Sequence, residues 1–407
     1  MRPGPRGARR LTRALGTAVA VALLAVAGCT ASGVTQHQAT AVDPVAASSA
    51  PATPAAPAVR LDVTPASDAR GVAPAEPVTV NAHNGRITSA TLTTARGRPV
   101  RGKISADGST WSATGALRFG TTYDLSVAAA DPAQRSKQLR TTFTTVTPKA
   151  TTYPSVIPLD GETVGVGIPI IIYWSKPVHD WAAAERGLKV TADKPVHGAW
   201  HWYSDTEVHF RPRHFWPAYT HVTIHIGVGG KDLGGGVYGE TSREIHFTVG
   251  SSMISRVSNA KHRMTVSRDG KVVRTMPVAL GLSRTPTSSG TMVVFEKYKQ
   301  KYFDSSTFGV PRDAPGGYYE KVYWDTKYTY GGEYVHAAPW SVVQQGHANA
   351  SHGCVNVSTA NAEWFYYHSK RGDVIQIQGT RRMVRPQDGW TDWNLSWSDW
   401  LAGSAVH

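Results

Sequence analysis

Short runs in which apolar and polar residues alternate dominate the chain between residues 61 and 250. In the first half of this region they are VTV (78–80), ITSATL (87–92), TYDLSV (122–127) and TTFTTV (141–146). In the second half they are IPIIIYW (168–174), EVHF (207–210), HVTIHI (221–226) and EIHFTV (244–249). A period of two predicts β-strands. Two successive segments of short strands, each about 100 residues long, predict two immunoglobulin-like sandwiches at 61–148 and 149–250.

The two segments resemble each other in sequence, which supports a repeated domain. LRFGTTYDLSV (117–127) aligns with RHFWPAYTHVT (213–223), and this alignment pairs Tyr123 with Tyr219. Each segment also ends on a strand that contains a Phe-Thr pair, at Phe143 and at Phe247.

The pattern changes at Ser251, where a third domain is predicted to begin and to extend to residue 379. RMTVSRDGKVVRTMPVALG (263–281) predicts two strands joined at Asp269-Gly270. Residues 299–332 are aromatic and rich in glycine and proline, which predicts a long loop. Two interpretations of this loop stay open: a lid over a binding site, or a surface excursion packed by its own aromatic residues.

The last part of the third domain is predicted to contain a strand, a helix and a final strand. GEYVHAAPW (332–340) predicts a strand that ends in a turn, and DVIQIQ (373–378) predicts the final strand. Between them, residues 358–372 predict a helix with Ser358 as its N-cap and Gly372 as its stop. Lys370 and Arg371 would lie in its last turn, where the helix dipole favours cations.

The C-terminal extension, residues 380–407, carries four tryptophans at helical spacing. They are Trp390, Trp393, Trp397 and Trp400. A tryptophan stripe on one helix face could bind sugar, but we favour a helix that seals onto the third domain. The predicted fold is therefore mostly β: two sandwiches, then a β-rich domain with a short helix and a tryptophan-rich extension.

The first 28 residues have the order of charges expected of an export signal. Residues 1–13 contain five arginines and no acid, and the apolar run at 14–28 is too short to span a bilayer comfortably. The run ends in LAVAGC, which resembles a bacterial lipobox with Cys29 as the lipidated residue. The alternative is an ordinary signal peptide that is cleaved near this position, with no role for Cys29. We expect anchoring on the outer face of the cell membrane, with residues 29–60 as a disordered tether into the periplasm or cell wall.

The charge of the chain is strongly positive, which limits its partners. The formal charge is +14, and loss of the five signal arginines leaves +9. Such a protein suits an anionic wall polymer or lipid headgroups, whereas export disfavours nucleic acid. Residues 149–250 are rich in histidine, but they show no metal-binding spacing, so we predict no metal and no cofactor.

The stretch SHGCVN (351–356) contains the second of only two cysteines. If Cys29 is lipidated, Cys354 has no partner for a disulfide, and it is either buried and inert or a nucleophile. A nearby histidine can take the thiol proton, and His352 and His336 are both candidates. The amides of Gly353 and Cys354 could form an oxyanion hole. This chemistry indicates acyl transfer.

The segment HAAPWSVVQQGHANASHGCVN (336–356) resembles the signature of the L,D-transpeptidases with a YkuD-type catalytic domain. TPTSSG (285–290), DSSTFGVP (304–311) and RGDV (371–374) are also similar to the mycobacterial subfamily that has two sandwiches and a lipobox. The resemblance implies 3→3 cross-linking of peptidoglycan stem peptides. The cysteine would attack the third residue of a tetrapeptide, release D-alanine, and pass the acyl group to the diaminopimelate amine of a second stem.

By this resemblance Cys354 is the nucleophile and His336 the general base, while His352 and Gly353 shape the nucleophile loop. The remaining implied site residues are Ser351 and Asn356, which brace the loop, and Tyr318, Gly332, Ala337 and Trp340, which bind substrate. Position 337 is often serine in the family, but alanine keeps the carbonyl that orients the base. Acylation by carbapenem-type β-lactams is implied as well. An L,D-carboxypeptidase and a non-enzymatic wall-binding lipoprotein are the alternatives.

Overall fold

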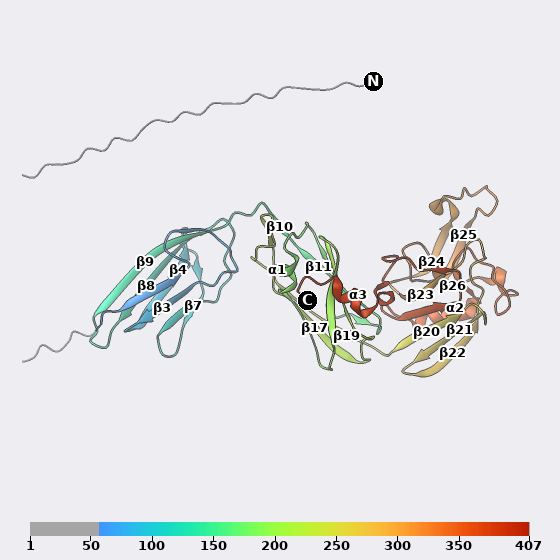
Figure 1. Ribbon diagram of the computed structural model, residues 1–407, viewed down its shortest axis with the longest axis horizontal. Coiled ribbons are helices and arrows are strands. Elements are labelled where there is room, and N and C mark those ends of the chain that lie inside the picture. Colours follow the sequence, from blue (N-terminus) through green and yellow to red (C-terminus); the bar gives the residue numbers. More distant parts are fainter. Residues whose placement is uncertain (1–56, 407) are drawn as a thin grey trace, which may run out of the picture. The chain divides into compact units, whose positions relative to one another are not determined.

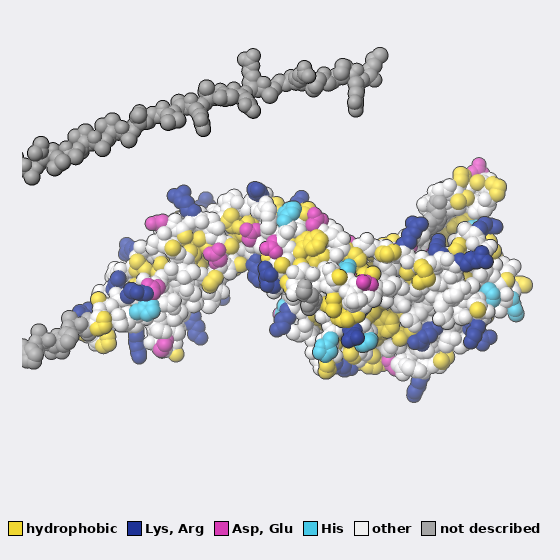
Figure 2. Space-filling view, viewed as in Figure 1, with side chains coloured by type: hydrophobic (Ala, Val, Ile, Leu, Met, Phe, Trp, Pro, Cys, Tyr) yellow, Lys and Arg dark blue, Asp and Glu magenta, His cyan; other side chains and the backbone are white. Residues whose placement is uncertain are grey.

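The protein is described here by a computed structural model that covers residues 57–406, and residues 57–407 cluster as one compact unit. The predicted signal peptide, Cys29 and nearly all of the predicted tether lie outside the described residues. Within the described range, no helix is long and apolar enough to cross a membrane. On the face shown in Figure 2, lysine and arginine side chains are scattered over the described surface.

The first sandwich pairs a four-stranded sheet with a five-stranded sheet (Figure 1). The four-stranded sheet has the order β1 (Arg60–Thr64), β3 (Thr79–His83), β7 (Thr110–Ala113), β6 (Gly102–Ile104). The five-stranded sheet has the order β2 (Ala69–Val72), β9 (Ser136–Thr145), β8 (Thr122–Ala130), β4 (Arg86–Thr94), β5 (Pro99–Val100). Alternate residues of β8 face the core, where Tyr123 stacks on Phe143 with ring centroids 5.3 Å apart.

The second sandwich is built from two four-stranded sheets and a small two-stranded sheet. The first sheet has the order β11 (Pro154–Ile157), β13 (Ile170–Trp174), β16 (Glu207–Pro212), β15 (Gly198–Ser204). The second has the order β12 (Thr163–Val164), β19 (Arg243–Val249), β17 (Thr220–Ile226), β14 (Leu188–Ala192). β10 (Ala150–Thr152) pairs with β18 (Val237–Gly239), and α1 spans Trp181–Glu185.

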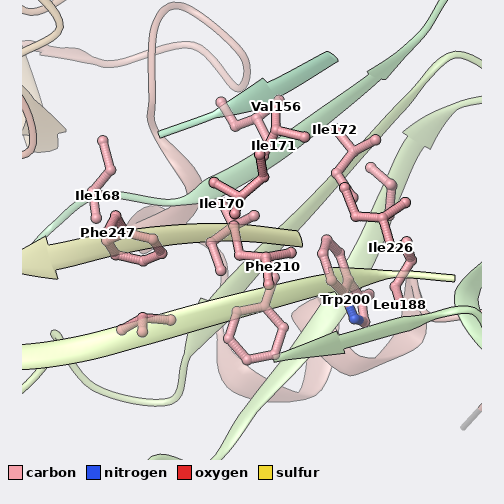
Figure 3. Close-up of a cluster of buried hydrophobic side chains, with 14 of the residues drawn as sticks. Val156, Ile168, Ile170, Ile171, Ile172, Leu188, Trp200, Phe210, Ile226 and Phe247 are labelled. Carbon is pink, nitrogen blue, oxygen red and sulfur yellow. The ribbon is translucent and has the colours of Figure 1, made fainter. Parts of the chain in front are cut away.

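The core of the second sandwich is continuous with the C-terminal domain. Ile170, Ile171 and Ile172 of β13 are all fully buried, so this strand is covered on both faces (Figure 3). The same hydrophobic cluster includes Val293 and Val374 of the C-terminal domain. Burial of apolar surface between the two domains therefore ties the C-terminal domain to the second sandwich.

The predicted repeat of two sandwiches is confirmed, but its residue alignment is wrong at one position. Tyr123 lies inside a strand and is buried, whereas Tyr219 precedes β17, has φ of 58° and is 58% exposed. The buried aromatic that packs on Phe247 is instead Trp216, at 5.8 Å between ring centroids.

The C-terminal domain contains a six-stranded and a four-stranded sheet. The six-stranded sheet has the order β22 (Lys271–Pro277), β21 (Arg263–Arg268), β20 (Met253–Ser258), β28 (Val374–Gln378), β23 (Ser288–Val293), β29 (Arg382–Met383). The four-stranded sheet has the order β24 (Glu296–Asp304), β25 (Tyr319–Lys327), β26 (Tyr334–Ala337), β27 (Val355–Val357). The predicted turn joins β21 to β22, with positive φ at Asp269 and Gly270. Helix α2 (Thr359–His368) lies against β25 and β26.

Most of the predicted loop at 299–332 is a long β-hairpin formed by β24 and β25. Only its tip is irregular, with the 3-10 helix η1 (Ser305–Phe308) followed by residues 309–318. Asp304 accepts a hydrogen bond from the Ser306 N–H at 3.0 Å and pairs with Arg312 at 2.5 Å. The strands carry aromatic and charged residues on both faces, which hides the alternation that identifies a strand.

The predicted helix at 358–372 is shorter than expected. Ser358 is the N-cap and accepts from the Asn361 N–H, but the helix ends at His368. Lys370 therefore lies beyond the last helical turn, and its ammonium group is 3.4 Å from the buried carboxylate of Asp373.

The C-terminal extension does not form one helix. Of its tryptophans, Trp390 packs on the third domain as predicted, against Phe295 at 5.7 Å between ring centroids, whereas Trp393 and Trp400 bond to the second sandwich. The extension contains the 3-10 helix η3 (Asp392–Asn394) and then α3 (Trp397–Ala402), whereas the 3-10 helix η2 (Pro339–Ser341) lies between β26 and β27. Trp400 Nε1 donates to the Ala199 carbonyl and Trp393 Nε1 to the Gly167 carbonyl, both in the second sandwich. The buried Arg211 guanidinium lies 4.6–5.3 Å from the ring centroids of Trp393, Trp397 and Trp400. This buried cation attracts the aromatic faces to the second sandwich.

A buried ionic network joins the extension to the second sandwich. His209 lies 2.7 Å from Asp392 and 2.8 Å from Glu207. Burial lowers the pKa of His209, but the charges and hydrogen bonds of Asp392 and Glu207 outweigh it and raise that pKa to about 9. The exposed histidines of this domain form pairs that solvent reaches, such as His221 with Asp193 at 2.7 Å.

We predict that this network makes stability fall at alkaline pH. The pKa of His209 is higher in the folded chain than its unfolded value of about 6.5, so its contribution is complete below about pH 6.5 and is lost as the pH rises through about 9. At about 1.4 kcal/mol per pKa unit, this contribution is about 3 kcal/mol. Chemical denaturation at pH 7 and pH 10 measures this contribution.

The Asp392→Asn variant should be less stable by about 3 kcal/mol at pH 7, and its stability should depend less on pH. The exposed control Asp193→Asn should cost under about 1 kcal/mol. An unchanged slope in Asp392→Asn would contradict this account.

Candidate active site

Cys354 lies at the end of a tight turn that leads into β27. Gly353 has φ of 137°, a conformation that side chains with a Cβ rarely adopt, so the turn requires glycine there. The Ser351 hydroxyl accepts from the Gly353 N–H at 3.1 Å and donates to the Cys354 carbonyl at 2.6 Å. Ser351 therefore fixes the turn, and the Gly353 N–H is already used. The predicted oxyanion hole loses this donor, which leaves the Cys354 N–H as the remaining candidate of the pair.

The parallel pairing of β26 with β27 brings His336 close to Cys354. His336 pairs with Asn356, and Val335 with Val355. Because side chains alternate along a strand, the odd-numbered valines enter the core while the even-numbered residues share the opposite face. His336 and Cys354 therefore line one cavity of about 280 Å³. Its other lining residues are Phe303, Gly316, Gly317, Tyr318, Glu320, Val322, Trp340, Ala350, Ser351, His352 and Asn356.

The tautomer of His336 is fixed by the neighbouring backbone. Its Nδ1 lies 2.9 Å from the Ala337 carbonyl. A carbonyl can only accept, so Nδ1 carries the proton and Nε2 has a free lone pair. Alanine at position 337 thus supplies the orienting carbonyl that was expected of it, without a hydroxyl.

Burial keeps both reacting groups neutral at rest. It lowers the pKa of His336 to about 4, although the Ala337 carbonyl and the Asn356 carboxamide oppose this shift. Cys354 is only partly buried as a residue, but burial of its sulfur raises the thiol pKa to about 12. The Tyr334 N–H lowers that pKa, whereas the charges of Glu333 and Asp325 raise it further. A thiol and a neutral imidazole therefore face the cavity at neutral pH.

The thiol itself contacts the Gly332 backbone. Its Sγ lies 3.7 Å from the Gly332 carbonyl, a weak hydrogen bond that orients the S–H. Gly332, predicted to bind substrate, thus contacts the nucleophile directly. Asn356, predicted to brace the nucleophile turn, instead donates from Nδ2 to the Ser341 hydroxyl at 3.1 Å. It therefore fixes β27 to the segment that follows β26.

The hairpin of β24 and β25, which Figure 1 shows, contributes Phe303, Tyr318 and Val322 to the lining of the cavity and is called its roof here. Phe303 packs edge-on against His336 at 5.2 Å, and Tyr318 lies 5.2 Å from His352, both between ring centroids. His352 is exposed and faces this roof, so of the two candidate bases the geometry favours His336. Trp340 is 53% exposed at the mouth, 6.1 Å from the His336 ring.

Comparisons with known proteins agree with this site. A model of the L,D-transpeptidase catalytic domain matches residues 252–377, and a bacterial Ig domain model matches residues 69–232. The chain is 42% identical to L,D-transpeptidase 2 of Mycobacterium tuberculosis (strain CDC 1551 / Oshkosh) over 348 residues, which is 85% of each protein.

The chain belongs to the L,D-transpeptidase family. It is also 34% identical to L,D-transpeptidase 5 of Mycobacterium tuberculosis (strain ATCC 25618 / H37Rv), over 86% of this chain and 78% of that protein. A solved structure of the L,D-transpeptidase LdtMt1 in complex with imipenem is 35% identical, with a TM-score of 0.49. The match covers 55% of this chain and 97% of that one. The family model and the 42% identical relative make the protein an enzyme and disfavour the alternative of a wall-binding lipoprotein without activity.

Two buried carboxylates and one partly exposed arginine near the thiol of this L,D-transpeptidase were missed by the sequence analysis. Glu333 is 5% exposed and pairs with Arg382, which belongs to the C-terminal extension. Asp325 is fully buried, both of its carboxylate oxygens lack a hydrogen-bond partner, and burial raises its pKa to about 7. The one sequence signal from which burial of Glu333 could have been predicted is the position of this acid at the start of an apolar strand, in GGEYVHA (331–337).

Proposed function

We propose that this enzyme forms 3→3 cross-links between peptidoglycan stem peptides through a thioester on Cys354. The observation that supports this most strongly is the neutral pair of Cys354 and His336, which line one roofed cavity with the imidazole held as a proton acceptor. Membership of the family indicates the class of reaction, and the geometry of the site indicates the roles of Cys354 and His336 in it.

In the first half-reaction, Cys354 Sγ attacks the carbonyl carbon of the third residue of a donor tetrapeptide. The thiol proton moves to His336 Nε2 as the C–S bond forms, and the Cys354 N–H stabilises the oxyanion. The C–N bond to the terminal D-alanine then breaks, and His336 returns the proton to the leaving amine. The products are a thioester and free D-alanine.

In the second half-reaction, the side-chain amine of an acceptor diaminopimelate attacks the thioester. His336 removes a proton from the amine, the C–S bond breaks, and the proton returns to the sulfur. If water replaced the amine, the product would be a tripeptide, as in an L,D-carboxypeptidase. Phe303, Tyr318 and Trp340 line the cavity of the thiol with aromatic surface, which supports the transferase because apolar surface there limits access of water.

Product analysis separates the two reactions. The compact unit of residues 57–407 is incubated with disaccharide-tetrapeptide, and the products are resolved by chromatography and mass spectrometry. Cross-linked dimer with released D-alanine is the expected result. Tripeptide without dimer would contradict the proposal and favour the hydrolase.

We predict that a carbapenem acylates Cys354. The strained lactam carbonyl is attacked by the thiol, and the C–N bond that breaks lies within the ring, so no fragment leaves in this step. Intact-protein mass spectrometry with imipenem should show an increase by the mass of the whole drug, mapped to the peptide that contains residue 354. The Cys354→Ser variant, which keeps the size but lacks the thiol, should show no adduct. An equal adduct on Cys354→Ser would place the reactive group elsewhere.

For its location we propose a lipid anchor at Cys29 on the outer face of the cell membrane. The charge pattern of residues 1–13, the short apolar run and the LAVAGC sequence support this. Anchoring would hold the catalytic domain within reach of the anionic wall. Detergent partitioning of cell extracts tests it: the chain should enter the detergent phase, and Cys29→Ser should not. Partitioning that does not depend on Cys29 would contradict the anchor.

A further inference from the structure

Arg382 connects the C-terminal extension to the active site. It lies beyond the segment that the catalytic-domain model matches, which ends at residue 377. Its strand, β29, pairs in parallel with β23, with Arg382 beside Ser288. From there its guanidinium reaches the Glu333 carboxylate, and the two side chains are 45% and 7% exposed. The extension therefore supplies a cation to a buried acid.

Glu333 is held from several directions. Its carboxylate accepts from the Ser288 N–H at 3.1 Å and from the Ser288 hydroxyl at 2.9 Å, in addition to Arg382. Its own N–H donates to the Thr329 hydroxyl at 2.9 Å. A buried carboxylate with this many donors is fixed in position, and with it the backbone on either side.

The backbone on both sides of Glu333 meets the catalytic sulfur. On one side the Gly332 carbonyl accepts from Cys354 Sγ at 3.7 Å. On the other side the Tyr334 N–H interacts with the same sulfur. The ionic pair also lies beneath the nucleophile turn: a Cβ built on Gly353 would be 3.8 Å from both Arg382 Nη2 and Glu333 Oε1.

We propose that Arg382 and Glu333 are positioning residues, which hold the Gly332 and Tyr334 peptide groups against the Cys354 sulfur. The extension thereby completes the active site. The extension stays in place because the Val384 N–H donates to the Ser289 carbonyl at 2.8 Å, and because Trp393 and Trp400 donate hydrogen bonds to the second sandwich. This inference rests on the proposed role of Cys354 as the nucleophile.

The test compares Arg382→Met with Arg381→Met, a matched change at the exposed neighbouring residue. Four quantities are measured on residues 57–407: kcat and KM for D-alanine release, the rate of Cys354 alkylation by iodoacetamide against pH, and the melting temperature. Arg382→Met should lower kcat about 10- to 100-fold with little change in KM, because the sulfur is displaced while the cavity mouth is intact. Its alkylation profile should move to higher pH, since the Glu333 charge loses its partner near the thiol. Arg381→Met should match the wild type.

Two further variants distinguish positioning from a general loss of stability. Arg382→Lys keeps the charge and should recover part of kcat. The double variant Glu333→Gln/Arg382→Met removes both charges and should return the alkylation profile toward that of the wild type. If Arg382→Met only lowers the melting temperature, with kcat and the alkylation profile of its folded fraction unchanged, the proposal is overturned. Alkylation needs no peptidoglycan, so a shifted profile in an enzyme that makes no dimer would sink the proposed function and leave the positioning role standing.

Discussion

Replacing Cys354 with alanine should abolish both D-alanine release and dimer formation, with a loss of about 10⁴-fold or more. In the proposed mechanism, both half-reactions pass through one C–S bond to Cys354. Among the residues that line the described cavity, no other side chain is a comparable nucleophile next to a neutral imidazole. Chromatography of products from disaccharide-tetrapeptide measures the loss.

Two controls make this result specific to the thiol. The melting temperature of Cys354→Ala should stay close to that of the wild type, because the side chain is small and the residue only partly buried. Cys354→Ser should be inactive as well, since a serine hydroxyl is far less acidic than a thiol. Dimer formed by a folded Cys354→Ala protein at a comparable rate would show that the sulfur is not the nucleophile.

Replacing His336 with glutamine should lower the acylation rate at pH 7 by about 10²- to 10⁴-fold and change its pH dependence. In the wild type the base must be neutral, and its pKa is lowered to about 4 by burial. The rate should therefore be flat from about pH 6 to 8 and fall only as the pH drops through about 4. Without the base, attack needs the thiolate, whose pKa is raised to about 12. The rate in His336→Gln should then rise about tenfold per pH unit.

Stopped-flow acylation by imipenem across this pH range measures the prediction. His368→Gln is the matched control, because His368 is an exposed histidine of α2 whose Nδ1 contacts only the Trp364 carbonyl. It should keep the flat profile. A flat profile in His336→Gln would mean that another group removes the thiol proton.

The alternation of apolar residues was sufficient to predict the two sandwiches and the order of the domains, because strands such as β8, β17 and β19 bury one face. It failed where both faces of an element carry similar residues. In the β24–β25 hairpin, aromatic and charged residues occur on both faces of the strands, so the segment was predicted as a loop. The tryptophans of the extension have helical spacing, but three of them surround Arg211 of the second sandwich, a contact that depends on tertiary structure.

The candidate site was predictable where its chemistry lies in one contiguous motif. Cys354, Ser351 and Gly353 stand together in the sequence, and His336 is brought to them by a parallel strand pair of short separation. Arg382 and Glu333 were not predictable, since they are 49 residues apart and meet only because β29 pairs with β23. The hydrogen bond from the Gly353 N–H to the Ser351 hydroxyl was not predictable either, because it depends on the folded geometry of the turn.

The acyl-enzyme itself gives the most direct test of the central proposal. The wild-type enzyme is mixed with disaccharide-tetrapeptide without an acceptor, quenched in acid within milliseconds to seconds, and digested for peptide mass mapping. We predict a thioester of the disaccharide-tripeptide on the peptide that contains Cys354, formed together with one equivalent of D-alanine. Release of D-alanine and formation of dimer with Cys354 unmodified at every time point would contradict the account.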